Sequence, residues 1–227
     1  MVMPVFFTIV FSEAFSGIVN LPGFPAADTV DWFLPTAAIM GSAFAGVTTG
    51  LGVARDLEIG FYERFLASPA PRSSLLGGAL GAAAVRALFP LTLVLLMGTL
   101  LGVNLPGGPA GLGILAVAGV GVSLSAAAWS LGIALRLKTL QSAPVMQMGV
   151  ILAIFLSTAQ MPLDLLTGWL ETVATYNPMT YILQLARQGF LETGISWADT
   201  WPGLVALGGL LAVLLLFAGR GMQRVIP

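Results

Sequence analysis

The chain has 227 residues, of which 57% are hydrophobic and only 8% charged, and its formal net charge is −1. Soluble globular domains carry roughly a quarter charged residues, so this composition indicates a protein that lies in a lipid bilayer. The lack of a basic excess argues against a nucleic-acid partner. Cysteine and histidine are both absent from the sequence, which excludes disulfide bonds and Ser–His catalysis.

Long charge-poor runs divide the sequence into predicted spans. A transmembrane helix needs about 20 predominantly apolar residues, because each residue advances the helix by about 1.5 Å. Five runs reach about that length, and one of them contains a single arginine near its middle. We predict full spans over residues 33–54, 73–103, 110–135, 139–163 and 201–219.

The beginning of the chain predicts a shortened first span over residues 1–19. Residues 1–12 are apolar but reach only about 18 Å as a helix, and Glu13, Pro22 and Pro25 interrupt the apolar sequence that follows. We therefore expect a first helix that has lost its natural beginning. With it, the sequence predicts an all-α integral membrane protein with six transmembrane helices, in one domain that includes all 227 residues.

The basic residues predict the orientation, because cytoplasmic loops carry an excess of lysine and arginine. Seven basic residues fall on one side of the predicted spans: Arg55, Arg64, Arg72, Arg136, Lys138, Arg220 and Arg224. Four tryptophans, which favour the membrane interface, fall on the other side: Trp32, Trp169, Trp197 and Trp201. The preference for arginine, alanine, glycine and leucine is typical of a GC-rich bacterial genome. We expect a multi-pass protein of a bacterial inner (plasma) membrane with both termini in the cytoplasm.

The cytoplasmic connection after the second span predicts an amphipathic helix over residues 56–67. Leu57, Phe61 and Phe65 recur at a spacing of four residues and form one stripe of the helix. A Ser-Pro pair at residues 68–69 ends it. Two interpretations stay open at this point: an interfacial helix with a solvated polar face, or a docking helix for a soluble partner.

The outer connection over residues 164–200 is too long to lack structure in a compact protein. Apolar stretches lie on either side of the turn signal Asn177-Pro178. This pattern predicts two short re-entrant helices before the last span, which dip into the outer membrane face where protein shelters their backbone groups.

Two groups of residues resemble one known family. The cytoplasmic group consists of Glu58, Gly60, Glu63, Arg64, Leu66, Ala67, Ser68, Pro69 and Arg72. The outer group consists of Asn177, Pro178, Met179, Tyr181 and Arg187. In residue type and position both resemble the motifs of ABC-2 type permeases, the membrane subunits of ATP-binding-cassette exporters, which include the daunorubicin-resistance type. The sequence departs from the family at Phe65, where leucine is more usual, and at its shortened beginning.

The resemblance implies a homodimeric or heterodimeric pore that two ATPase subunits drive. The coupling helix that receives the ATPase movement would contain Asp56, Glu58, Gly60, Glu63, Arg64, Leu66, Pro69 and Arg72. The outer gate would contain Asn177, Pro178, Tyr181 and Arg187. Substrate would pass between the two membrane halves.

The chain itself carries no phosphate-binding loop of the Walker type. That loop needs two glycines, a lysine and a serine or threonine at fixed spacing, because backbone N–H groups and the lysine hold the phosphates. Lys138 lies between Gly132 and Thr139, but Leu137 occupies the position of the second glycine. We therefore expect no cofactor on this chain and expect ATP and Mg²⁺ to bind a partner ATPase.

The fifth predicted span has a mixed polar and soft apolar face that suits a substrate path. Its members are Met146, Gln147 and Gln160. Ordinary packing between helices explains the same face equally well. Three glycine pairs spaced by four residues are interpreted as packing sites that allow helices to approach closely: Gly46/Gly50, Gly77/Gly81 and Gly98/Gly102.

The favoured function is a permease subunit that exports an amphipathic drug-like or lipid-like substrate by alternating access, with glycan export as an alternative within the same family. An ion-coupled secondary transporter would need acidic or histidine residues near the membrane midplane, and the full spans predicted here contain none. A membrane-embedded enzyme would need a carboxylate pair within the membrane, and the same spans contain no such pair.

Overall fold

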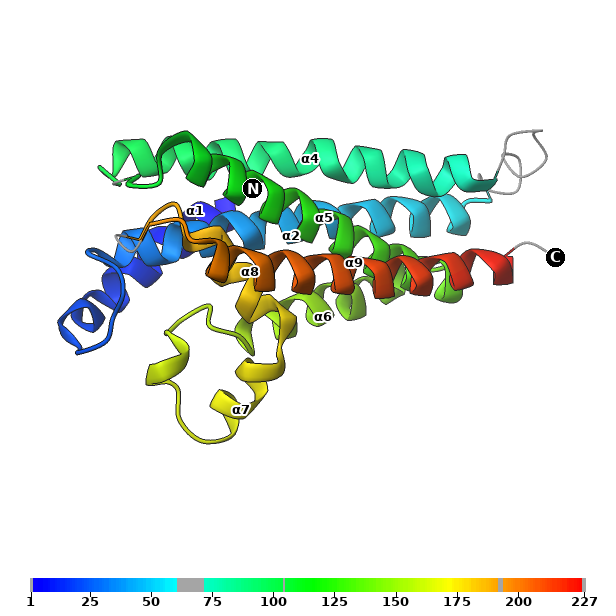
Figure 1. Ribbon diagram of the computed structural model, residues 1–227. Coiled ribbons are helices and arrows are strands. Elements are labelled where there is room, and N and C mark those ends of the chain that lie inside the picture. Colours follow the sequence, from blue (N-terminus) through cyan, green and yellow to red (C-terminus); the bar gives the residue numbers. More distant parts are fainter. Residues whose placement is uncertain (1, 61–71, 104, 192–193, 226–227) are drawn as a thin grey trace.

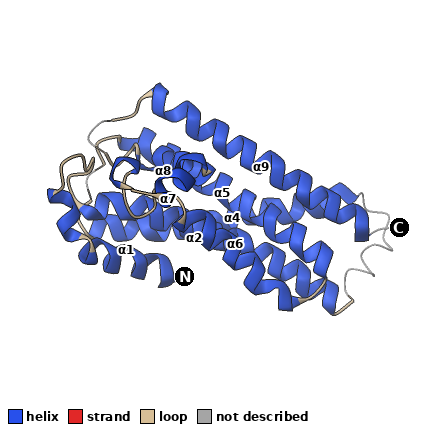
Figure 2. Ribbon diagram, turned by 90° about the horizontal axis from the view of Figure 1, so that it is seen from below, coloured by secondary structure: helices blue, strands red, loops and turns tan. Residues whose placement is uncertain are grey.

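The computed structural model describes residues 2–60, 72–103, 105–191 and 194–225, and within these ranges the regular structure is helical, with no strand (Figure 2). Four long helices run side by side along the molecule (Figure 1): α2 (Thr29–Glu58), α4 (Arg72–Leu100), α5 (Gly108–Leu137) and α9 (Trp197–Val225). Each is long and apolar enough to cross a membrane. They correspond to four of the predicted spans, those over residues 33–54, 73–103, 110–135 and 201–219.

The two other predicted spans are shorter helices. α1 (Val2–Ala14) and α6 (Ala143–Phe155) each have 13 residues, about 20 Å of helix, which is less than the roughly 30 Å of a bilayer core. α1 begins beside the middle of α2, because Pro4 lies against Gly41, and it leads into a 3₁₀ turn, η1 (Ser16–Asn20). A total of six spans therefore remains a prediction.

The fifth predicted span, residues 139–163, begins with the 3₁₀ turn η2 (Leu140–Ser142) and continues as α6. Its helical part ends at Phe155. A turn follows, then η3 (Leu163–Leu165), α7 (Trp169–Tyr176) and α8 (Pro178–Arg187). α7 projects to the side of the four long helices, and α8 returns toward them (Figure 1). The two short helices on either side of Asn177 occur where the sequence predicted them, and their re-entry into the membrane stays a prediction.

α5 occupies the centre of the packing and contacts α2, α4, α8 and α9. Glycine on α2 makes its close approach to α5 possible. A Cβ atom on Gly46 would lie 2.2 Å from the carbonyl oxygen of Ser123, and one on Gly50 would lie 2.4 Å from the Ser130 side chain, both on α5. The packing role predicted for this glycine pair is therefore confirmed, whereas a Cβ on Gly77 or Gly81 would meet no atom of the described residues within 4 Å.

Basic and aromatic residues lie at opposite ends of the long helices. We call the basic end the one that carries Arg55, Arg136, Lys138 and Arg220, near the C-terminal ends of α2, α5 and α9. We call the tryptophan end the one where α2 and α9 begin, with Trp32, Trp197 and Trp201. These two ends are opposed in Figure 1, as the predicted orientation requires.

Candidate functional site

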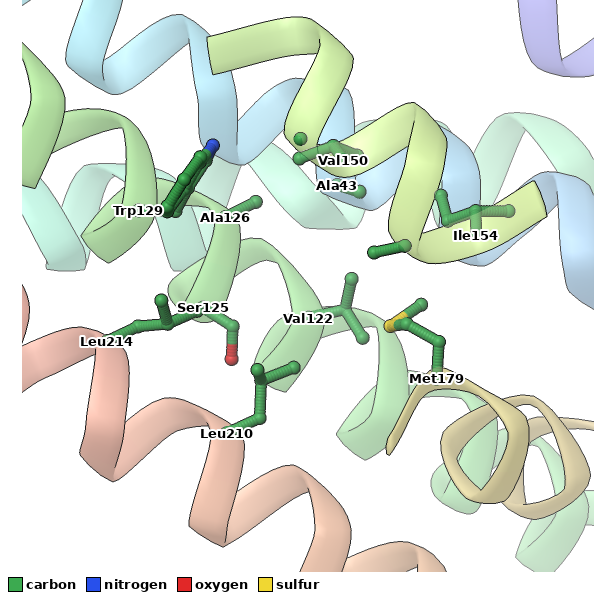
Figure 3. Close-up of a pocket in the computed structure, with 12 residues that line it drawn as sticks. Ala43, Val122, Ser125, Ala126, Trp129, Val150, Ile154, Met179, Leu210 and Leu214 are labelled. Atoms are coloured by element: carbon green, nitrogen blue, oxygen red, sulfur yellow. The ribbon is translucent and has the colours of Figure 1, made fainter. Parts of the chain in front are cut away.

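An apolar cavity of about 200 Å³ lies where α2, α5, α6, α8 and α9 meet (Figure 3). Its lining consists of Ala43, Val122, Ser125, Ala126, Trp129, Gly149, Val150, Ala153, Ile154, Met179, Leu210 and Leu214. Small side chains on α2, α5 and α6 leave the space, while Met179 and Leu210 approach it from α8 and α9 (Figure 3).

The two polar groups in this lining are already satisfied. The Ser125 hydroxyl donates to the carbonyl of Gly121 at 2.9 Å, and the indole N–H of Trp129 donates to the carbonyl of Met146 at 3.2 Å. Gly149 allows the indole this position, because a Cβ there would lie 2.7 Å from the Trp129 ring. Since no lining group needs a polar partner, the cavity suits an aromatic ring or a short alkyl group.

The predicted substrate-path residues do not come together at this cavity. Met146 is fully buried and its backbone carbonyl accepts from Trp129, the side chain of Gln147 is exposed, and Gln160 lies half-buried in the turn after α6. The cavity uses the later part of the same helix, at Gly149 and Ala153. Sequence reasoning missed these small apolar residues, and their only signal was that they lie within a predicted span.

Asn177 links α6 to α8. Its side-chain nitrogen donates to the carbonyl oxygens of Ala153 at 2.8 Å and Leu156 at 2.9 Å, which are the carbonyls left without partners where α6 ends. Its side-chain oxygen caps α8 by accepting from the backbone N–H of Met179 at 2.9 Å. Pro178 takes the first position of α8, where its missing N–H costs nothing.

Tyr181, the third of the predicted gate residues, ties α8 to α7, since its hydroxyl donates to the carbonyl of Thr175 at 2.9 Å. Asn177 and Tyr181 therefore both hold α8 in place. Asn177 connects it to α6, and Tyr181 connects it to α7.

Arg187, at the end of α8, is only 1% exposed, although the sequence placed it in an outer loop. Its guanidinium stacks on the Trp32 ring, with Cζ 3.6 Å from the ring centroid. It donates to the carbonyl of Trp32, to the hydroxyl of Thr36 and to the carbonyl of Ala159. Arg187 thus joins α8, α2 and the turn after α6 at the tryptophan end.

The helix predicted over residues 56–67 is not continuous, because α2 ends at Glu58 and residues 59–60 form a turn. Asp56 and Glu58 belong to α2, and Gly60 then turns the chain with φ +72°, a conformation that glycine adopts without strain. Arg72 is the first residue of α4. The remaining members of the predicted helix lie outside the described residues: Glu63, Arg64, Leu66 and Pro69.

Glu58 connects the end of α2 to the beginning of α6. Its carboxylate accepts from the backbone N–H of Leu140 at 3.1 Å, in the turn η2 that leads into α6. α6 is therefore hydrogen-bonded at one end to the segment predicted to contact the ATPase and at the other end to Asn177. Its side chains between these two links line the apolar cavity.

Comparisons with known proteins identify the family and two relatives of this chain. A family described as ABC-2 type transporter matches residues 1–191. The chain is similar to the daunorubicin resistance ABC transporter permease protein DrrB1 of Streptomyces coeruleorubidus, with 24% identity over 93% of this chain and 74% of that protein. It is also similar to the putative transport permease ycf38 of Cyanophora paradoxa, with 29% identity over 74% of this chain and 58% of that protein.

Proposed function

We propose that this chain, a transporter membrane subunit that belongs to the ABC-2 type transporter family, is the permease of an ATP-binding-cassette exporter. The membership favours a transporter over an enzyme. In this proposal a separate ATPase subunit binds ATP and Mg²⁺, and a second permease copy, identical or related, completes the pathway. The complex lies in a bacterial inner membrane, with the basic end and both termini in the cytoplasm.

The apolar cavity is the observation that carries the proposed substrate class. Its volume of about 200 Å³ is below the roughly 300–1,000 Å³ of complete small-molecule sites, so it receives the apolar part of a larger molecule. Sugars would leave their hydroxyl groups without partners against this lining. The cavity therefore supports an amphipathic drug-like or lipid-like substrate over a glycan.

The two links of α6 support the proposed mechanism. Movement of the ATPase would displace the segment after Glu58, and the bond from Glu58 to Leu140 would pass this displacement to α6. Asn177 at the other end would pass it to α8 and the outer gate. Because α6 lines the cavity, the same displacement would alter the space available to substrate.

Filling the cavity tests this function. Ala153→Leu is expected to lower ATP-driven transport of a planar apolar dye about tenfold or more, because the larger side chain occupies the space that the dye needs. Transport is measured in proteoliposomes that contain this chain and its co-purified ATPase. Ala84→Leu is the matched control, since Ala84 is also half-buried but lies on α4, outside the cavity lining.

Equal dye transport by both variants and the unmodified chain would contradict the substrate class, because a filled cavity would then have no effect. Equal loss in both variants would contradict it too, since the loss would not depend on the cavity.

A further inference from the structure

A second cavity, of about 380 Å³, lies at the tryptophan end between α8, the beginning of α2, the turn after α6 and the beginning of α9. Its lining includes Trp32, Thr158, Asp164, Arg187, Gln188 and Asp199. It differs from the apolar cavity in its charged and polar lining, and Asp164 and Asp199 are exposed, so the cavity opens to the surface.

Several buried polar atoms of this lining have no hydrogen-bond partner among the described residues. They are Nη1 of Arg187, Nε1 of Trp32, the hydroxyl of Thr158 and Nε2 of Gln188. The four side chains are 1%, 4%, 1% and 4% exposed, in that order. A buried donor without a partner destabilises the fold, and more so when it is charged, so their concentration around one cavity points to a ligand with acceptor atoms.

The first three of these atoms indicate which ligand group would suit the buried part of the cavity, away from the exposed aspartates. The guanidinium nitrogen and the indole nitrogen are donors only, and the Thr158 hydroxyl can donate. The Gln188 carboxamide contributes less specifically, because its oxygen is engaged with Thr200 at 2.9 Å. Three donors, one of them cationic, suit the oxygen atoms of a phosphate group.

The exposed part of the lining has the opposite charge. Asp164 and Asp199 place two carboxylates against the single arginine, so the cavity as a whole disfavours a ligand that is only anionic. A ligand with a phosphate group inside and an ammonium group at the opening satisfies both parts.

We propose that this cavity binds a zwitterionic phosphate headgroup, with the phosphate at Arg187, Trp32 and Thr158 and the ammonium group at Asp164 and Asp199. A volume of about 380 Å³ accommodates a group of that size. The unpartnered atoms are shielded from solvent, so binding requires a movement of the cavity wall that exposes them to the ligand. The site does not depend on whether the chain transports its substrate by ATP or by an ion gradient.

Native mass spectrometry of the full chain, purified in detergent with equal amounts of phosphatidylethanolamine and phosphatidylglycerol, tests the proposal. The unmodified chain is expected to retain phosphatidylethanolamine in preference to phosphatidylglycerol. Thr158→Val removes one free donor and preserves the side-chain shape, and Trp32→Phe removes another and keeps an aromatic ring beneath Arg187, so each is expected to lower retention about fivefold. Thr92→Val, on the exposed surface of α4, is the control and is expected to have no effect.

The exposed carboxylates provide a second test that does not touch the buried core. Asp164→Asn is expected to move the preference toward phosphatidylglycerol, because it weakens the attraction for the ammonium group. Glycerophosphoethanolamine, which lacks acyl chains, distinguishes a free headgroup compound from a membrane lipid as the ligand. Competition by this soluble compound supports a free headgroup as ligand, and failure to compete, with the variant effects intact, supports a membrane lipid. Equal retention of both lipids, or retention unchanged by Thr158→Val and Trp32→Phe, would overturn the proposal.

Discussion

Replacing Gly46 with alanine is expected to lower the free energy of unfolding by about 3 kcal/mol. The new Cβ would lie 2.2 Å from the carbonyl oxygen of Ser123 and 3.0 Å from the backbone nitrogen of Ala127. Both are backbone atoms of α5, so the contact is relieved only if the helices α2 and α5 move apart. Because α5 also contacts α4, α8 and α9, such a movement disturbs the packing of the whole bundle.

Gly52→Ala provides the matched control on the same helix. A Cβ at Gly52 meets no atom within 4 Å, and alanine stabilises a helix by up to about 1 kcal/mol relative to glycine. This variant is therefore expected to unfold at the same or a slightly higher temperature than the unmodified chain. Thermal unfolding of the two variants in one detergent measures the difference, and equal destabilisation would show that the α2–α5 approach is not the cause.

The second prediction concerns the link between α6 and α8. Asn177→Asp preserves the oxygen that caps α8 but replaces the donor nitrogen with a charged oxygen that faces the carbonyls of Ala153 and Leu156. Two hydrogen bonds of about 1 kcal/mol each correspond to a change of roughly thirtyfold in an equilibrium between two states. We expect transport per ATP hydrolysed to fall by about that factor, because movement of α6 no longer reaches α8.

Asp28→Ala distinguishes loss of the link from loss of a helix cap. Asp28 caps α2 by accepting from the backbone N–H of Val30, and its removal is expected to cost about 1 kcal/mol of stability without changing the number of molecules transported per ATP. The ratio of dye transport to ATP hydrolysis is measured for both variants in the same proteoliposomes. An unchanged ratio in Asn177→Asp would show that α6 does not pass the ATPase movement to α8.

The long helices could be predicted from the sequence because a charge-free run longer than a bilayer core leaves the chain few alternatives to a spanning helix. Composition does not set where such a run stops being helical. α6 ends at Phe155 within an apolar stretch, and the side chain that satisfies its last carbonyls is Asn177, 21 residues after Leu156. A prediction from local sequence cannot include that partner.

In the candidate site too, some features could be predicted from local sequence and others depend on residues far away in the chain. Asn177, Pro178 and Tyr181 stood out because a turn signal and a family motif coincide there, and the structure gives each a definite contact or position. The depth of Arg187 could not be predicted, since it depends on Trp32 and Thr36, more than 150 residues earlier in the chain. The apolar cavity depends on five helices meeting at one level, which no local pattern records.

Transport by the reconstituted chain, measured with separate control of nucleotide and ion gradients, tests whether this chain is the permease of an ATP-driven exporter. We expect that dye leaves the cytoplasmic side only when the co-purified ATPase, ATP and Mg²⁺ are all present, and that its transport continues when ionophores remove every ion gradient. Dye transport by this chain alone, driven by an ion gradient without nucleotide, would contradict it and would identify a secondary transporter.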